Sequence, residues 1–147
     1  MSECPFCNID YNRTRIIDES PKSLTVLSNP ALMRGHCLII PRKHVEKISE
    51  LDEEELKDLM GEVIKIEELL LKKYSGCDIR QNYRPFQQQS DFKVNHLHFH
   101  LQPRLLYDNL YKKCQVYEKS VFRMLNSNEL NESMKFILNG NFIGDHK

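Results

Sequence analysis

Three histidines, His96, His98 and His100, recur at every second position of one segment, and the residues between them are apolar. This alternation is the period of a β-strand, in which successive side chains point to opposite faces. On a helix, the same spacing would spread the imidazoles around the axis. Three imidazoles on one strand face are costly to bury unless a metal ion, an anion or a proton transfer uses them. The segment therefore predicts a functional site.

A Cys-x-x-Cys pair, Cys4 and Cys7, stands near the N-terminus. In a reducing compartment such a pair is either half of a zinc site or a redox dithiol. A thioredoxin-like dithiol follows a strand, and only three residues precede Cys4. A zinc site needs two further ligands later in the chain. From the pair alone, both interpretations remain open.

Two further histidines flank an apolar run that predicts a strand over residues 36–40. His36 begins the run, and His44 follows Pro41 just beyond its end. Because the run is almost continuously apolar, we expect it to be a central strand of a sheet. A single histidine at either position is usually structural, but a pair flanking a buried strand points again to a site.

Composition and charge are those of an ordinary globular protein. Of the 147 residues, 40% are hydrophobic and 29% are charged, and the formal net charge is zero. This balance gives no indication of a nucleic-acid or membrane surface. No apolar run approaches the ~20 residues that span a bilayer, and no signal-peptide core is seen. We therefore expect a cytoplasmic protein whose five cysteines are thiols or metal ligands.

A long helix is predicted over residues 52–74. Asp52 is a suitable N-cap, and Glu55 three residues later completes a capping-box pattern. Apolar residues recur at three- and four-residue steps and predict one buried stripe. Its members are Leu56, Leu59, Met60, Val63, Ile66 and Leu70. We expect Gly76 to end the helix in the left-handed conformation.

The remaining pattern predicts an α+β fold with about five antiparallel strands, the long helix and additional C-terminal helices. The strands are expected over residues 15–19, 24–28, 36–40, 77–83 and about 94–102, and Pro103 is expected to end the last one. Helices are expected over 109–124 and 130–138. The tail after Gly140, with His146, is expected to carry no function.

The sequence resembles the histidine-triad (HIT) family, whose signature is His-φ-His-φ-His-φ-φ with φ apolar. It stands here as His96-Leu97-His98-Phe99-His100-Leu101-Gln102, with Gln102 in place of the last apolar residue. The Gly-His strand and Pro-basic-basic-His turn of the family match residues 35–44, and its N-terminal Cys-x-x-Cys matches residues 4–7. The resemblance implies a single HIT-like domain over 1–147, with a core of about 4–104 and a helical extension of about 105–139.

The resemblance implies a nucleotide hydrolase or transferase. His98 would attack the α-phosphorus of a nucleoside phosphoramidate or a dinucleoside polyphosphate and form a covalent nucleotidyl-histidine. His100 would donate to a phosphate oxygen and stabilise the transition state. His36 would support these two histidines by orienting them.

The resemblance also implies a structural zinc ion. In family members with the Cys-x-x-Cys pair, the ligands correspond to Cys4, Cys7, His44 and His96. Two thiolates and two imidazoles complete the four-coordinate preference of zinc and leave no open position, which is typical of a structural site.

Nucleotide contacts are harder to transfer from the family. Its ribose-binding residue lies eight positions before His36, which gives Ser28, and the neighbouring Asn29 could serve only if the loop shifts. Asn82, at the end of its predicted strand, would correspond to an amide facing phosphate.

The family's Gly-Gln pair ahead of the signature is missing here. Gln89, Ser90 or Lys93 would have to replace its phosphate contacts, because the loop over residues 84–91 differs from the family pattern.

Two rival functions remain open beside this one. The histidines His96, His98 and His100 (or His36) could bind a catalytic metal ion. Alternatively, the chain could bind nucleotides with reduced or no catalysis. As partners, the resemblance implies a nucleotide substrate and a second copy of the chain in a homodimer; no membrane and no specific nucleic acid are expected.

Overall fold

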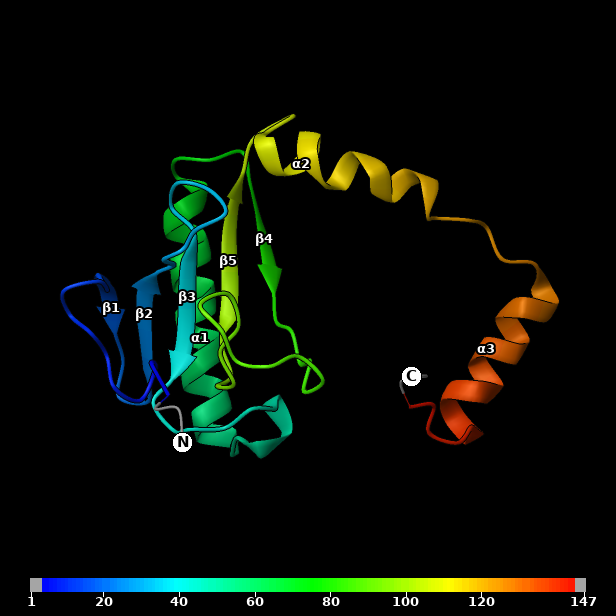
Figure 1. Ribbon diagram of the computed structural model, residues 1–147, viewed down its shortest axis with the longest axis horizontal. Coiled ribbons are helices and arrows are strands. Elements are labelled where there is room, and N and C mark those ends of the chain that lie inside the picture. Colours follow the sequence, from blue (N-terminus) through cyan, green and yellow to red (C-terminus); the bar gives the residue numbers. More distant parts are fainter. Residues whose placement is uncertain (1–3, 145–147) are drawn as a thin grey trace. The chain divides into compact units, whose positions relative to one another are not determined.

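The computed structural model describes residues 4–144, and residues 16–104 contain a five-stranded antiparallel sheet (Figure 1). The strand order is β1-β2-β3-β5-β4, with antiparallel neighbours throughout. The strands are β1 (Ile16–Glu19), β2 (Ser23–Leu27), β3 (Cys37–Pro41), β4 (Gly76–Arg80) and β5 (Phe99–Arg104). The predicted α+β class with five antiparallel strands is confirmed.

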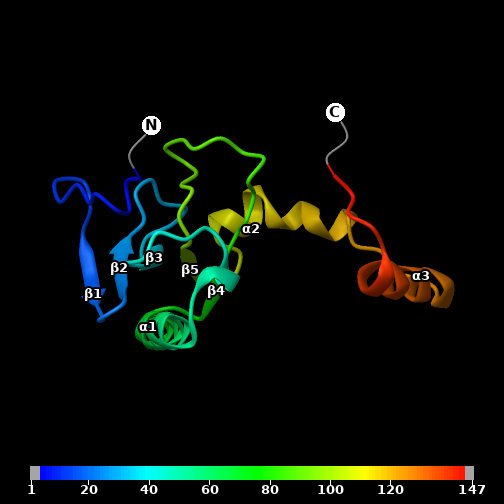
Figure 2. The ribbon, with the colours of Figure 1, turned by 90° about the horizontal axis from the view of Figure 1, so that it is seen from below.

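One long helix, α1 (Glu53–Leu71), covers one face of the sheet, after the short 3-10 helix η1 (Ile48–Glu50). Figure 2 shows α1 on one side and, on the other, the N-terminal segment and the β4–β5 connection. The predicted capping box is confirmed: the Glu55 N–H donates to the Asp52 carboxylate, and the Asp52 N–H donates to the Glu55 carboxylate, both at 2.8 Å.

The predicted helix end at Gly76 is wrong. The helix ends at Leu71, and Gly76 is the first residue of β4. The Tyr74 N–H still reaches the carbonyl of Leu70 at 3.0 Å, so the chain leaves the helix through right-handed turns and needs no left-handed glycine. Of the glycines described, only Gly35 has a positive φ, at 85°.

Apolar side chains pack on both faces of the sheet, because successive β3 residues point to opposite sides. The layer under α1 contains Cys37, Ile39, Val45, Leu59, Val63, Ile66, Leu70, Leu97 and Leu101. The opposite layer contains Leu24, Val26, Leu38 and Ile40, with Phe6, Ile9 and Ile16 packed against it. The predicted apolar stripe of α1 is confirmed except at Leu56, which is 37% exposed.

One acidic side chain interrupts the stripe of α1. Glu62 is buried and accepts a hydrogen bond from the hydroxyl of the fully buried Thr25 on β2, at 3.1 Å. Burial raises the pKa of Glu62, although the hydrogen bond from Thr25 opposes this shift. The helix–sheet interface therefore contains a polar pair that the apolar periodicity does not predict.

The histidine strand is shifted from its predicted position of about 94–102. Strand β5 begins at Phe99 and includes Pro103, which we had expected to end it. Pairing with β3 ends at Cys37 opposite Leu101, so Pro103 lies where β5 has β4 alone as its partner. Pro103 has no N–H to donate, and this costs little stability where no β3 residue lies opposite as a hydrogen-bond partner.

The alternation itself is confirmed. Leu97 and Leu101 are buried in the layer under α1, and Phe99 packs against it. His100 pairs with Leu38 of the opposite layer, so it lies on the face away from α1.

The C-terminal part contains α2 (Asn109–Lys113), the 3-10 helix η2 (Gln115–Ser120) and α3 (Ser127–Asn139). The predicted helix over 109–124 is thus two short helices, and the one over 130–138 begins earlier, capped by Asn126. The chain divides into two compact units, up to Leu110 and from Tyr111. Among residues 111–144, none is buried.

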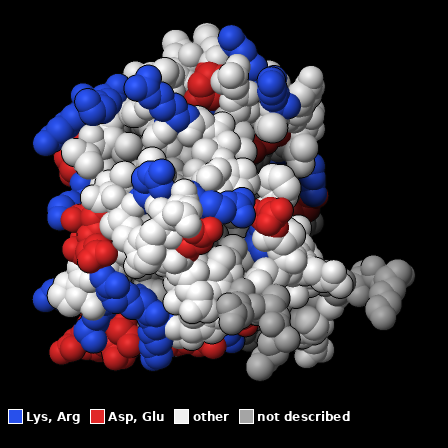
Figure 3. Space-filling view, turned by 60° about the vertical axis from the view of Figure 1, so that its left-hand side comes forward, with Lys and Arg blue, Asp and Glu red and all other residues white. Residues whose placement is uncertain are grey.

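Charged side chains of both signs occur on the face shown in Figure 3, in keeping with the zero net charge. In the described part of the chain, no helix has the length and apolar character needed to cross a bilayer. His146 lies outside the described residues.

Candidate functional site

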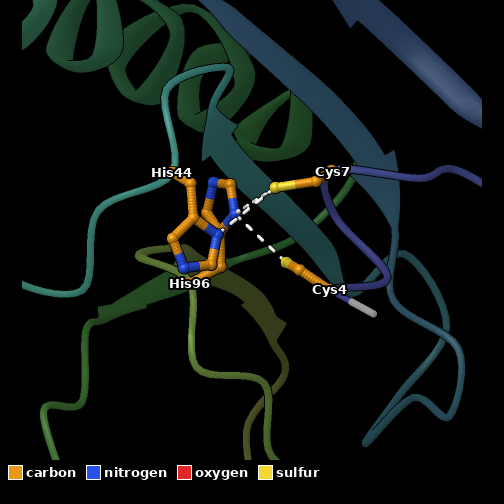
Figure 4. A group of neighbouring side chains, drawn as sticks. All are labelled: Cys4, Cys7, His44 and His96. Carbon is orange, nitrogen blue, oxygen red and sulfur yellow. Dashed lines mark hydrogen bonds between the residues drawn. The ribbon is translucent and has the colours of Figure 1, made fainter. Parts of the chain in front are cut away.

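Four residues from three separate segments converge beside the sheet (Figure 4). Cys4 and Cys7 come from the N-terminal segment, His44 from the turn after β3, and His96 from the approach to β5. Their ligand atoms all lie within 4.8 Å of one another. The Cys7 Sγ lies 3.3 Å from His44 Nδ1 and 3.6 Å from His96 Nδ1, and the Cys4 Sγ lies 3.4 Å from His96 Nδ1. This group could hold a metal ion.

The buried His96 is oriented for this role by its other ring nitrogen. Its Nε2 donates to the main-chain oxygen of Pro41 at 2.8 Å, which leaves Nδ1 unprotonated toward the thiols. A carbonyl that fixes the tautomer in this way is the usual neighbour of a metal-binding imidazole.

A second histidine group lies on the same face of the sheet. His36 immediately precedes β3, His100 lies in β5, and His36 Nε2 is 2.9 Å from His100 Nδ1. The ring centroid of His98 lies 4.8 Å from that of His100. The structure thus brings together the three histidines that the sequence predicted as catalytic.

Main-chain atoms fix the protons on these rings. The Leu32 N–H donates to His36 Nδ1 at 3.1 Å, so the proton of neutral His36 is on Nε2. His36 Nε2–H therefore donates to His100 Nδ1, and neutral His100 carries its own proton on Nε2.

His98 has the opposite tautomer. Its Nδ1–H donates to the main-chain oxygen of His96 at 2.7 Å, which leaves a lone pair on Nε2. His98 and His100 lie side by side, so the site offers one unprotonated ring nitrogen on His98 and one N–H donor on His100.

Burial keeps the supporting imidazoles neutral. It lowers the pKa of His36 to about 4, helped by the charge of His98, and the pKa of His100 to about 3, helped by the charges of His98, His36 and Arg80. Burial also lowers the pKa of His98. At neutral pH, His36 and His100 are therefore in the form that the tautomer assignment requires.

A cavity of about 420 Å³ opens over His36, His98 and His100. Its walls come from the irregular residues 5–14, from the end of β2 and the loop after it at residues 26–32, and from the β4–β5 connection at residues 90–94. A cavity of this size accommodates a small molecule.

The residues predicted to bind nucleotide divide between two places. Ser28 and Asn29 line the cavity, and the Asn29 side-chain amide donates to the Arg13 carbonyl at 3.3 Å, which joins two walls. Asn82 borders a separate hollow of about 20 Å³, and the Gln89 side chain accepts from the Asn95 N–H at 3.3 Å. Neither lines the large cavity, so this geometry gives no support to a nucleotide contact from Asn82 or Gln89.

Many residues of the cavity wall were not predicted as site residues from the sequence, Phe6, Asp10 and Arg13 among them. Asp10 and Arg13 bring charges to the cavity, and Phe6 brings an aromatic ring. The irregular segment that carries them has no periodicity from which the directions of its side chains could be deduced. The one available signal is the position of Phe6 between the two cysteines.

Comparisons with known proteins agree with this geometry. A family model described as HIT domain matches residues 11–105. The Schizosaccharomyces pombe protein named adenosine 5'-monophosphoramidase hnt1 is 29% identical over 106 residues, which are 69% of this chain and 74% of that protein.

Two solved structures extend the comparison. A member of the HIT family of proteins from Bacillus subtilis has a TM-score of 0.68 at 22% identity and covers 97% of this chain and 99% of its own. A zinc-bound histidine triad family protein from Mycobacterium smegmatis has a TM-score of 0.61 at 25% identity and covers 74% of this chain and 79% of its own.

Proposed function

The chain belongs to the HIT family, and on this premise we propose that it is a nucleotide hydrolase or transferase with His98 as its nucleophile. The substrate is a nucleoside phosphoramidate or a dinucleoside polyphosphate, attacked at the α-phosphorus. One observation carries the proposal: the unprotonated Nε2 of His98 stands beside the N–H donor of His100 at the same cavity.

The reaction follows from these two nitrogens. His98 Nε2 forms a bond to the α-phosphorus while the bond from phosphorus to the leaving amine or phosphate breaks. The carbonyl of His96 continues to accept from Nδ1–H and stabilises the positive charge on the ring. The His100 N–H donates to a phosphate oxygen. Water then attacks phosphorus and breaks the Nε2–P bond. A leaving amine takes up one proton and the water releases one, so one water is consumed.

We further propose that Cys4, Cys7, His44 and His96 hold a structural zinc ion. Around a tetrahedral zinc ion, a sulfur and a nitrogen ligand stand about 3.6 Å apart. The three short sulfur–nitrogen distances, 3.3, 3.4 and 3.6 Å, are close to this value. The Mycobacterium smegmatis relative is described as zinc-bound, which supports zinc as the metal to test here. Four protein ligands leave no position for substrate.

The nucleotide would occupy the cavity with its phosphate at the histidines. Ser28 and Asn29 are the proposed polar contacts, because both line the cavity. The S. pombe relative's name supports adenosine phosphoramidates as the first substrates to test. A homodimer and a cytoplasmic location stay predictions.

The test compares wild type and His98→Ala with an adenosine phosphoramidate and with diadenosine polyphosphates. We expect wild-type turnover, a nucleotide trapped covalently on wild type alone, and a loss of about 10³-fold or more in kcat for His98→Ala. Zinc content and circular dichroism serve as controls for folding. Turnover that does not depend on His98 would contradict the proposal.

The same assays separate the rivals. A catalytic metal ion predicts that a chelator abolishes turnover reversibly and that no covalent nucleotide accumulates. A binding protein predicts tight mononucleotide binding without turnover of either substrate class.

A further inference from the structure

The N-terminal segment contributes both to the cavity and to the group of Cys4, Cys7, His44 and His96, called here the metal-ligand group. Residues 4–15 form no helix or strand. Cys4 and Cys7 supply half of the ligand group, and seven residues of the segment line the cavity. The ligand group is therefore one anchor of a cavity wall that has no secondary structure of its own, beside the Asn29–Arg13 hydrogen bond and the packing of Phe6 and Ile9.

Phe6, between the two cysteines, makes the closest link between the two sites. Its ring centroid lies 5.8 Å from that of His96 and 5.2 Å from that of His98, with interplanar angles of 76° and 78°. Edge-to-face contacts at these distances are the favoured geometry for ring pairs. Phe6 also lines the cavity and packs against the apolar layer of Leu24, Val26 and Leu38.

His98 is thus held from two directions. The carbonyl of His96 fixes its Nδ1, and Phe6 contacts its ring. Both holding groups depend on the ligand group: His96 is itself a ligand, and Phe6 lies in a loop with a cysteine ligand on each side. Within this loop, the N–H groups of Cys7 and Asn8 both donate to the Cys4 carbonyl at 3.1 Å, so Phe6 has little freedom once the thiols are fixed.

We propose that Phe6 is a positioning residue through which the metal-ligand site orients the nucleophile and closes the nucleotide cavity. The inference rests on the proposed function for the identity of nucleophile and nucleotide. Metal binding fixes both ends of the Cys-x-x-Cys loop, the loop presses the Phe6 ring against His98, and the same ring completes the wall. Loss of the metal then lowers nucleotide affinity and the order of the His98 ring together.

The test uses Phe6→Leu in the zinc-loaded protein, because leucine keeps an apolar side chain and removes the ring. Phe6→Tyr restores the ring, and Tyr11→Leu is the matched control in the same segment, since Tyr11 is 68% exposed and does not line the cavity. Zinc content is measured for every protein. The readouts are the nitrogen-15 spectrum of the histidine rings without nucleotide, the Kd for AMP, and kcat and KM separately.

We expect Phe6→Leu to retain zinc and to shift and broaden the ring signals of His98, because the His96 carbonyl then holds the ring without the Phe6 contact. It should bind AMP about 3- to 10-fold more weakly, the range of one lost ring contact. Phe6→Tyr and Tyr11→Leu should resemble wild type. Wild-type protein stripped of zinc should depart from the wild-type His98 spectrum at least as far as Phe6→Leu does, because both holding groups are then released.

A zinc-loaded Phe6→Leu protein with the wild-type His98 spectrum overturns the inference, as does a stripped protein with that spectrum. The ring spectrum needs no substrate. If wild type turned over neither substrate class, the proposed function would fail, while the spectrum would still decide whether Phe6 orients His98.

Discussion

His36 determines which nitrogen of His100 carries the proton, because a main-chain N–H determines the tautomer of His36 itself. In His36→Ala, His100 Nδ1 loses its donor, and the ring can take the tautomer with no proton on Nε2, the nitrogen proposed to contact phosphate. We expect kcat for an adenosine phosphoramidate to fall about 10- to 100-fold, because the loss of one hydrogen bond in a buried site has an effect of about this size on a rate. The change in KM should be smaller. An unchanged kcat would remove His36 from the catalytic group.

The buried histidines also make stability depend on pH. Burial lowers the pKa of His36 to about 4 in the folded chain, against an ordinary value of 6.5. Between these values the unfolded chain binds more protons than the folded one, so stability is full above pH 6.5 and is lost as the pH falls toward 4.

His36→Ala should therefore show a shallower loss of stability than wild type between pH 6.5 and 4.5. Urea unfolding at steps of pH measures it, and acid release of zinc affects both proteins alike. Parallel curves for the two proteins would mean that His36 is not held neutral by the fold.

The sequence predicted which histidines share one face of the strand, but it did not predict which other side chains line the cavity beside them. Spacing placed His98 and His100 on one face because strand geometry is local. Phe6, Asp10 and Arg13 could not be found in this way, since they reach the cavity from an irregular segment that lies beside the distant residues His44 and His96.

Among the elements, the approach to β3 depends on a glycine. Gly35 has a φ of 85°, and a Cβ there would lie 3.2 Å from Pro103 Cγ and 3.2 Å from the Tyr74 hydroxyl. We expect Gly35→Ala to reduce the free energy of unfolding by about 1–3 kcal/mol, from backbone strain and crowding together. It should also weaken nucleotide binding, because His36 follows directly.

Gly61 in α1 is the matched control. A Cβ there would meet nothing within 4 Å, so Gly61→Ala should raise the free energy of unfolding by about 0.5–1 kcal/mol through helix propensity. Urea denaturation measures both variants. Equal effects at the two positions would contradict the role given to the backbone of Gly35.

Element boundaries show what the sequence leaves undetermined. The start of α1 was predictable because Asp52 and Glu55 form a local capping box. The limits of β5 were not, since β5 begins opposite Ile39 of β3 and continues through Pro103 to Arg104 by pairing with β4. The burial of Glu62 was equally unpredictable, because its partner Thr25 lies 37 residues away.

For the molecule as a whole, the metal-ligand group joins the N-terminal segment to the sheet. If zinc occupies it, Cys4→Ser should lower the Tm by about 10 °C or more, because structural zinc contributes its binding free energy to folding. Cys114→Ser is the control, since Cys114 is exposed and outside the group. Thermal unfolding with and without a chelator measures both. An equal Tm for Cys4→Ser and wild type, both loaded with zinc, would contradict a structural ion.

For the C-terminal unit, the sequence predicted helices but not what their apolar side chains contact. Its helical segments were expected from apolar periodicity, yet Met134, Ile137 and Leu138 of α3 are 56%, 78% and 71% exposed. Periodicity tells which side of a helix is apolar, but not which surface covers it.

The protons of the reactive group are placed by main-chain atoms, the amide of Leu32 and the carbonyl of His96. These atoms are common to nearly every amino acid, so the side chain at position 32 can drift over evolutionary time without disturbing the protonation pattern, provided that proline does not enter. A motif search therefore detects the imidazoles and overlooks the group that sets their chemistry. In relatives of this chain, the course of the loop at position 32 is a better guide to reactivity than the residue found there.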